Sequence, residues 1–155
     1  MTIVFVCTGN TCRSPMAEAF ARRLSAERGL DVNFASAGTG AAAGAPATDA
    51  AILVGLERGV DLSRHRSRPL QPALVDESTV VLAMSAGHVA GIRAAVPNAR
   101  VFLLDEYGSY GASMRTVADP FGGDLADYRR AADEIEAMLG PVLDRVAAEH
   151  GAGSP

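Results

Sequence analysis

The stretch VCTGNTCRSP, Val6 to Pro15, joins an apolar run to a segment with helical spacing. The apolar run IVFV, Ile3 to Val6, is continuous rather than alternating, which is typical of a strand buried on both faces of a parallel sheet. Ser14 is a good N-cap residue and Pro15 suits the first position of a helix, so the pattern predicts that a helix begins there. The stretch therefore indicates a strand, a tight loop and a helix in succession, as in α/β folds.

Strand and helix patterns alternate along the rest of the chain. Continuous apolar runs predict further strands over residues 79–84 and 101–104, and VNFASA is a weaker candidate over residues 32–37. Apolar spacing predicts helices that end at Gly29 and Gly59, a short one over residues 86–96, and a long one over residues 125–146 that Gly140 and Pro141 kink or divide. We therefore expect an α/β protein with a small doubly wound, flavodoxin-like, four-stranded parallel sheet and helices on both faces.

The composition is that of an ordinary globular protein. The chain has 155 residues, of which 48% are hydrophobic and 21% charged, and this predicts one domain over residues 1–150 with a frayed tail over residues 151–155. No apolar run approaches the ~20 residues that span a bilayer, and no secretory leader pattern opens the chain, so we expect a cytoplasmic protein without a membrane partner. Because 14 basic residues face 18 acidic ones without a basic stripe, nucleic acid is not an expected partner. We also expect a monomer.

The loop after the first strand has the residues of an anion cradle. Successive backbone N–H groups in front of a helix can point at one spot. Gly9 permits the backbone angles of a tight cradle, and Asn10 tolerates a left-handed conformation. Arg13 offers a planar fork that matches two phosphate oxygens. Cys7 would then lie in a concentrated positive potential, and we expect it to be a thiolate nucleophile at neutral pH.

Two other features near this loop have more than one interpretation. Cys12 is either a packing residue or a partner that captures an oxidised Cys7 as a reversible disulfide. With only two cysteines in the chain, a zinc site lacks ligands, and we expect neither a metal nor a cofactor. The cationic cluster RHRSR, residues 64–68, is a candidate for attracting an anionic substrate.

The stretch VCTGNTCRSPMAE resembles the signature of the low-molecular-weight protein tyrosine phosphatases, in which Cys, five residues, Arg and Ser follow one another. SAG at residues 36–38, LSRHRSR at 62–68 and DPFGG at 119–123 follow in the family's order. The resemblance implies a phosphorylated protein as substrate, a phosphocysteine on Cys7 and a Ser14 hydroxyl bound to the sulfur. It implies that Asn10, Ser36 and His65 brace the loop, although His65 is equally interpreted as a surface histidine. The implied substrate-binding residues are Thr8, Gly9, Asn10, Thr11, Cys12, Ser14 and Phe121.

A thiolate that attacks phosphorus has to expel a poor leaving group, so a carboxylic acid is needed to protonate it. The candidates are Asp105, Glu106, Asp119, Asp124 and Asp127, and the sequence barely separates them. Asp119 precedes Pro120 in the loop before the last helix, and similarity to the family's Asp-Pro motif selects it. The implied mechanism has two steps, in which Asp119 first protonates the leaving group and then activates water against the phosphocysteine, with Arg13 stabilising the phosphoryl oxygens.

The residue between Asn10 and Cys12 bears on the substrate. The resemblance implies a bulky aliphatic residue there in typical tyrosine phosphatases and threonine in bacterial protein arginine phosphatases, and this chain has Thr11. Its hydroxyl could bond a guanidinium leaving group or the attacking water. Phe121 stands where tyrosine phosphatases usually have adjacent tyrosines, and would form an apolar, stacking wall. We therefore favour phosphoarginine in proteins as the substrate, with phosphotyrosine as the alternative.

Three rival functions are less well supported. GTGAAAG, residues 38–44, imitates a dinucleotide-binding motif, but Pro46 places the next helix start too late for one. Arsenate reductases of this fold need further cysteines, and none follows Cys12. A noncatalytic phosphate-binding module would be expected to lose the nucleophile or the acid, and both residue types are present.

Overall fold

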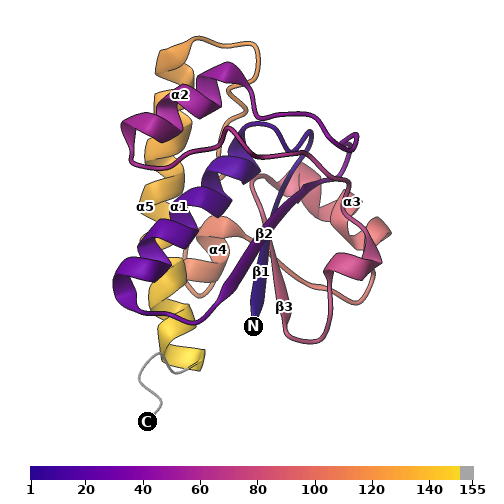
Figure 1. Ribbon diagram of the computed structural model, residues 1–155. Coiled ribbons are helices and arrows are strands. Elements are labelled where there is room, and N and C mark those ends of the chain that lie inside the picture. The colour runs from indigo at the N-terminus through magenta and orange to yellow at the C-terminus, as the bar shows by residue number, and fades with distance from the viewer. Residues whose placement is uncertain (151–155) are drawn as a thin grey trace.

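The computed structural model describes residues 1–150 as a central sheet between helices (Figure 1). The strands are β1 (Thr2–Cys7), β2 (Asn33–Gly38), β3 (Thr79–Ala83) and β4 (Arg100–Leu103), all parallel, in the order β2-β1-β3-β4. This confirms the predicted doubly wound α/β fold. The predicted frayed tail, residues 151–155, lies outside the described residues.

Alternate residues of β1 face two different cores. Ile3 and Phe5 pack with α1 (Arg13–Arg28), α2 (Asp49–Glu57), α4 (Leu104–Gly108) and α5 (Leu125–His150). Val4 and Val6 pack on the other face with α3 (Ala86–Ala95). Figure 1 shows the same division, with α3 on one side of the sheet and α1, α2, α4 and α5 on the other. Because β1 is covered on both faces, its sequence is continuously apolar rather than alternating.

The elements differ from the predicted ones in three places. Helix α1 begins at Arg13 with Cys12 as its N-cap, so the predictions that Ser14 is the cap and Pro15 the first helical residue are wrong. The fourth strand ends at Leu103, and Leu104 opens the short helix α4, which the sequence analysis missed together with a 3₁₀ turn at Pro72–Leu74. Helix α5 is continuous through Gly140 and Pro141 rather than divided.

Burial explains why α5 continues through its proline. Proline removes one helical N–H and disfavours a helix interior. The neighbouring side chains of Leu139, Val142 and Leu143 are completely buried, which holds this turn against the core. At Gly108 an added Cβ would lie 2.9 Å from the backbone nitrogen of Val142, so the end of α4 can approach α5 only because this residue is glycine.

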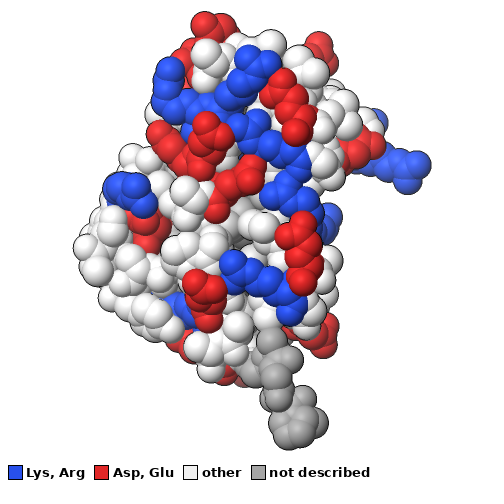
Figure 2. Space-filling view, turned by 90° about the vertical axis from the view of Figure 1, so that its left-hand side faces the viewer, with Lys and Arg blue, Asp and Glu red and all other residues white. Residues whose placement is uncertain are grey.

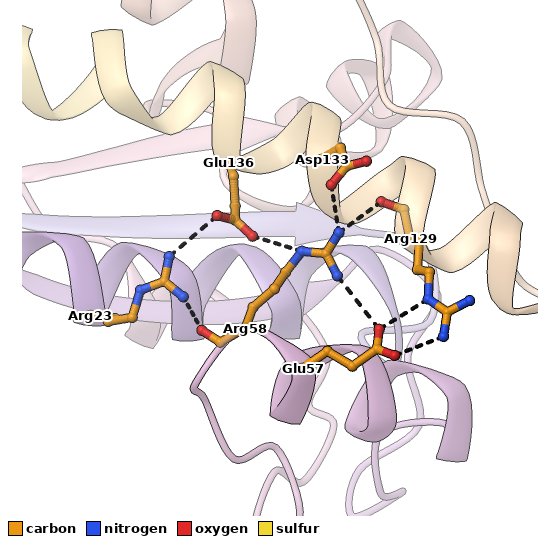
Figure 3. A network of polar contacts seen from close by, with 6 residues as sticks. All are labelled: Arg23, Glu57, Arg58, Arg129, Asp133 and Glu136. Atoms are coloured by element: carbon orange, nitrogen blue, oxygen red, sulfur yellow. Dashed lines mark hydrogen bonds and ion pairs between the residues drawn. The ribbon is translucent and has the colours of Figure 1, made fainter.

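Ion pairs tie α2 to the two helices beside it (Figure 3). Arg58, next after α2, lies with Nε 2.8 Å from Glu136 of α5 and also pairs with Asp133 and Glu57. Glu136 pairs in turn with Arg23 of α1 at 3.3 Å, and Arg129 of α5 pairs with Glu57 at 2.7 Å. We call these six residues the α2 ion network. Figure 2 shows both signs of charge interleaved over this face, and every basic residue there is arginine because the chain has no lysine.

The strand order determines where a ligand can bind. The chain winds from β1 to β2 on one side and then crosses to β3 on the other, so the carboxyl ends of β1 and β3 border the crevice where doubly wound sheets bind ligands. Cys7 is the last residue of β1, and the loop that follows it opens at this crevice. Among residues 1–150, no helix has an apolar stretch long enough to cross a bilayer.

Candidate active site

The loop between β1 and α1, residues 8–12, has one left-handed residue. Asn10 has a φ of 56°, which asparagine tolerates better than most residues. Gly9 does not have a positive φ, so the expectation that its conformational freedom shapes the cradle is not supported. A Cβ added at Gly9 would make an ordinary contact with the Thr11 hydroxyl at 3.6 Å, so the space at this position does not require glycine either.

Backbone donors of this loop are unused. Among residues 1–150, no group accepts a hydrogen bond from the backbone N–H groups of residues 8–12. Cys12 caps α1 without a side-chain hydrogen bond, so the first turn of the helix is also open. Unpaired backbone N–H groups at the positive end of a helix dipole form a binding site for an anion.

The nucleophile candidate lies at the base of this cradle. Cys7 is buried, with 3% of its surface exposed, and its Sγ lies 2.9 Å from Ser14 Oγ. The same hydroxyl accepts a hydrogen bond from Asn10 Nδ2 at 2.8 Å. Because the helix begins before Ser14, its hydroxyl serves the sulfur and the loop rather than an N-cap bond. The placement matches the family role implied for Ser14, which is to bond the sulfur.

The guanidinium of Arg13 is buried and only partly satisfied. Its Nη1 donates to the carbonyl of Val117 at 3.0 Å, and its Nη2 lies 3.6 Å from Asp119 Oδ2. Its Nε is buried and has no hydrogen-bond partner among the described residues. A buried charged donor without a partner is costly. This nitrogen therefore keeps an unused donor on the residue that follows the loop.

The structure separates the five candidate acids. Asp119 alone among them pairs with Arg13, and its side chain is 53% exposed. It also accepts a hydrogen bond from the backbone N–H of Phe121 at 3.1 Å. The other four carboxylates accept hydrogen bonds elsewhere. Glu106 accepts from the N–H of Leu103, and Asp105 accepts from the segment after α4. Asp124 and Asp127 cap the start of α5.

Asp105 has a structural role in the same region. Its carboxylate accepts hydrogen bonds from the Ser113 hydroxyl and from the backbone N–H of Arg115 at 2.8 Å. Burial acts to raise the pKa of Asp105, but these hydrogen bonds and the Arg115 charge outweigh it and hold that pKa below its usual range. The bonds fix the segment that leads to Val117, whose carbonyl in turn positions Arg13.

Side chains from distant segments hold Asn10 in place. Its Nδ2 donates to Ser36 Oγ at 3.0 Å, and its Oδ1 accepts from the Arg68 N–H at 3.0 Å. Nε2 of His65 lies 2.7 Å from the Asn10 carbonyl oxygen, which places His65 against the loop rather than on an isolated surface turn. Ser36 donates in turn to Glu18 at 2.6 Å. These contacts explain how the loop keeps a left-handed residue at its buried middle position.

The RHRSR cluster also lines a hollow of its own. Arg64, Arg66 and Arg68 line a hollow of about 340 Å³ together with Glu18 and Arg22, and neither Arg13 nor Asp119 borders it. We call residues 8–12 the phosphate loop, after its proposed function. The cluster contacts this loop through His65 and Arg68. A role for the cluster in attracting substrate stays a prediction.

Cys12 lies in a buried cluster of hydroxyl groups. Its Sγ is 3.4 Å from the hydroxyl of Tyr128 and 3.7 Å from that of Thr48. Burial, and next the contact with Cys12, raise the pKa of Tyr128 to about 12. Both cysteines are free thiols in this structure. The protective disulfide therefore stays a prediction, and Tyr128 and Thr48 are neighbours that sequence reasoning missed.

His88 is a further site residue that sequence reasoning missed. It lies in the first turn of α3, and its Nε2 is 2.9 Å from the Thr8 hydroxyl. No local motif signals this contact, because its two residues are 80 positions apart. The substrate wall predicted at Phe121 is available, since this side chain is 69% exposed beside Asp119.

The fold and this cradle, with Cys7 at its base and Arg13 at its end, define a class of phosphatase. The family model described as low molecular weight phosphotyrosine protein phosphatase matches residues 2–152, and the chain belongs to this family. A protein-arginine-phosphatase of Bacillus subtilis is 43% identical over 143 residues, covering 90% of this chain and 92% of its own. A protein-arginine-phosphatase of Geobacillus stearothermophilus is 40% identical, covering 95% and 97%.

Solved structures agree with this assignment. A YwlE arginine phosphatase, a mutant with a phosphorylated active-site serine, superposes with a TM-score of 0.91 at 37% identity and covers 98% of this chain and 99% of its own. The Vibrio vulnificus protein Wzb in complex with benzylphosphonate has a TM-score of 0.82 at 27% identity and covers 93% and 97%. The relatives include proteins named for arginine phosphatase activity and a probable protein tyrosine phosphatase of Ralstonia solanacearum.

Proposed function

We propose that this chain is a cysteine-dependent phosphoprotein phosphatase that removes the phosphoryl group from phosphoarginine in proteins. The observation that carries the phosphatase assignment is the buried Nε of Arg13, which has no partner among the described residues and lies on the guanidinium that pairs with Asp119. Together with the free N–H groups of residues 8–12, it supplies the donors that a phosphoryl group requires.

The reaction follows from the positions of the three groups. The Cys7 thiolate attacks phosphorus, so that an S–P bond forms as the bond to the leaving nitrogen breaks, and Asp119 gives its proton to that nitrogen. Asp119, now a carboxylate, takes a proton from water as the water attacks the phosphocysteine. The S–P bond breaks and inorganic phosphate leaves. The Ser14 hydroxyl, 2.9 Å from the sulfur, stabilises the thiolate as it departs.

Thr11 supports phosphoarginine as the substrate. It is half-buried and carries its hydroxyl in the loop proposed to hold the phosphoryl group. A hydroxyl can accept from a guanidinium N–H, and an aliphatic side chain cannot. The relatives named protein-arginine-phosphatase are 43% and 40% identical to this chain, whereas a probable tyrosine phosphatase of Ralstonia solanacearum is 34% identical. Phosphotyrosine is the alternative substrate.

Parallel turnover measurements test the substrate. Wild type and Thr11→Ile are assayed on a protein carrying phosphoarginine and on a phosphotyrosine peptide. Isoleucine is expected to lower kcat/KM for phosphoarginine more than for phosphotyrosine, by about 10- to 100-fold, because pocket changes of this size shift preference by ~1 to 3 kcal/mol. Equal losses on both substrates would remove the support that Thr11 gives to phosphoarginine.

The covalent intermediate is tested separately. Acid quenching of wild type during turnover is expected to trap one phosphoryl group on Cys7, detected as a mass increase of the peptide that contains it. Cys7→Ser is expected to abolish turnover, and retained turnover in this variant would show that the nucleophile lies elsewhere. We further propose that residues 1–150 act as one monomeric cytoplasmic domain without a nucleic-acid partner.

A further inference from the structure

His88 lies across the crevice from the strand that carries the nucleophile. The N–H of Met84, just after β3, donates to the carbonyl of Val6 at 3.2 Å, so the start of α3 adjoins the end of β1. His88 is in the first turn of α3 and only 6% exposed. The two-step reaction makes no use of it, and Ser36 and His65, which brace Asn10, come from the opposite side, from β2 and from the segment after it.

Both nitrogens of the His88 ring contact hydroxyl groups. Nε2 lies 2.9 Å from Thr8 Oγ1, and Nδ1 lies 3.1 Å from Ser85 Oγ, the residue before α3. In a neutral imidazole one nitrogen donates and the other accepts, and hydroxyl groups can do either. An uncharged His88 ring can therefore make both hydrogen bonds, one to Ser85 and one to Thr8.

The charges around His88 favour that uncharged ring. Arg13 and Asp119 are the charged groups that act on it. Burial, and next the charge of Arg13, lower the pKa of His88 from its ordinary value, while Asp119 opposes them. At neutral pH the ring is thus an uncharged hydrogen-bonding group near Arg13, the residue proposed to bind the phosphoryl group.

Thr8, which contacts Nε2 of His88, is the first residue after Cys7. Its carbonyl accepts a hydrogen bond from the Gly40 N–H at 3.0 Å, and a Cβ added at Gly38 would lie only 2.3 Å from that carbonyl oxygen. The backbone of Thr8 is therefore packed closely against the end of β2. Its side chain is exposed, and the contact with His88 holds it from the β3 side. The start of the loop is fixed between two neighbouring strand ends.

We propose that His88 is a positioning residue of this active site, which acts through Thr8 to fix the start of the phosphate loop and with it the direction of the Cys7 sulfur. This inference rests on the proposed phosphatase function and extends it. Ser85 sets the orientation of the ring, and Thr8 transmits it to the loop. The role differs from that of Ser36 and His65, which hold Asn10 at the middle of the loop.

Two amide substitutions distinguish this role from simple packing. The amide of His88→Gln can reach the place of Nε2 and restore the bond to Thr8, whereas the shorter amide of His88→Asn reaches only the place of Nδ1. On both phosphoarginine and phosphotyrosine substrates, the Gln variant is expected within about twofold of wild-type kcat/KM. The Asn variant is expected to lose about 2- to 10-fold, the usual weight of one hydrogen bond. His150→Gln, at the exposed end of α5, is the matched control.

A double-mutant cycle tests whether Thr8 and His88 act through the same hydrogen bond. Thr8→Val removes the same hydrogen bond at an exposed residue, so it is informative even if the Asn variant unfolds, as a thermal melt would show. The double variant Thr8→Val with His88→Asn is expected to lose no more than the worse single variant. Losses that multiply, or equal activity of the Gln and Asn variants, would overturn the positioning role.

The two substrates keep this inference separate from the proposed function. If wild type hydrolyses phosphotyrosine but not phosphoarginine, the proposed substrate is wrong, and the ranking of the His88 variants is decided on phosphotyrosine. A wild-type chain that hydrolyses neither substrate would overturn both proposals.

Discussion

The buried guanidinium of Arg13 lies 3.6 Å from the half-exposed carboxylate of Asp119. In the proposed reaction, this ion pair joins the arginine that binds the phosphoryl group to the carboxyl that gives the proton, although one belongs to the start of α1 and the other to the loop before α5. Arg13 therefore contacts the loop that carries Asp119 twice, at the carboxylate and at the Val117 carbonyl.

Replacing the acid is expected to slow the reaction in a way that depends on the leaving group. Asp119→Asn should lower kcat/KM, which reports the first step and not the later hydrolysis of the phosphocysteine, about 10²- to 10⁴-fold on phosphoarginine, because general acid catalysis contributes that much. The loss should be much smaller on p-nitrophenyl phosphate, whose leaving group needs no proton. Steady-state kinetics on both substrates checks this, with Asp124→Asn, a residue at the start of α5, as the control. Equal losses on the two substrates would contradict the acid role.

Asn10 allows conformation and hydrogen bonding to be tested apart. Glycine keeps the left-handed φ of 56° but loses the side-chain bonds to Ser14, Ser36 and Arg68. Asn10→Gly and Asn10→Ala should both lower kcat/KM at least about 10-fold, because several hydrogen bonds are lost. Asn10→Ala should also lower the free energy of unfolding by about 1 kcal/mol more than Asn10→Gly. Urea unfolding and turnover are measured together, and equal stability of the two variants would argue against a strained residue 10.

Asp105 predicts a pH dependence of stability. Its pKa is lower in the folded chain than in the unfolded one, so its contribution is fully present above the unfolded value of about 3.9 and is lost as the pH falls through the lower folded value. Urea unfolding of wild type and Asp105→Asn between pH 7 and pH 2.5 should show a difference that is largest above pH ~4 and shrinks below it. The exposed Asp31→Asn serves as control. A difference independent of pH would contradict this.

The α2 ion network is expected to contribute to stability in a salt-dependent way. Arg58 is only 18% exposed and contacts carboxylates of α2 and α5 (Figure 3). Arg58→Ala should lower the free energy of unfolding by about 1 to 2 kcal/mol, more than an exposed pair does. Part of this loss should disappear in 1 M salt. Arg130→Ala removes only an exposed pair within α5 and should lower the free energy of unfolding less. A larger loss for Arg130→Ala than for Arg58→Ala would contradict a stabilising role of the network.

Much of the fold is predictable from local patterns, and its exceptions have physical causes. Strands β1 and β3 are continuous apolar runs, so they are evident in the sequence. Helix α4 has five residues, too few for a periodic pattern. Ser14 has the residue type of an N-cap, but Cys7 and Asn10 use its hydroxyl, and the helix begins earlier.

The site shows the same limit. The proposed nucleophile, Cys7, and the proposed phosphate-binding residue, Arg13, lie in one short stretch, so a motif predicts them. The five candidate acids are indistinguishable in sequence, since only tertiary contacts show that Asp105 is occupied by Ser113 and that Asp119 faces Arg13. The contact between His88 and Thr8 joins residues 80 positions apart, and no local signal could have predicted it.

The groups that hold the phosphate loop lie far from it in the sequence, and this affects how the chain folds. The loop itself is continuous, but its contacts span separations of 26, 55, 58, 80 and 104 residues. Contacts of large sequence separation carry the greatest loop-closure cost and form late. The cradle therefore acquires its working shape only when β2, α3 and the segment before α5 have all docked. Recovery of turnover during refolding should lag behind the return of helical circular dichroism, so catalysis reports completed assembly of the whole chain.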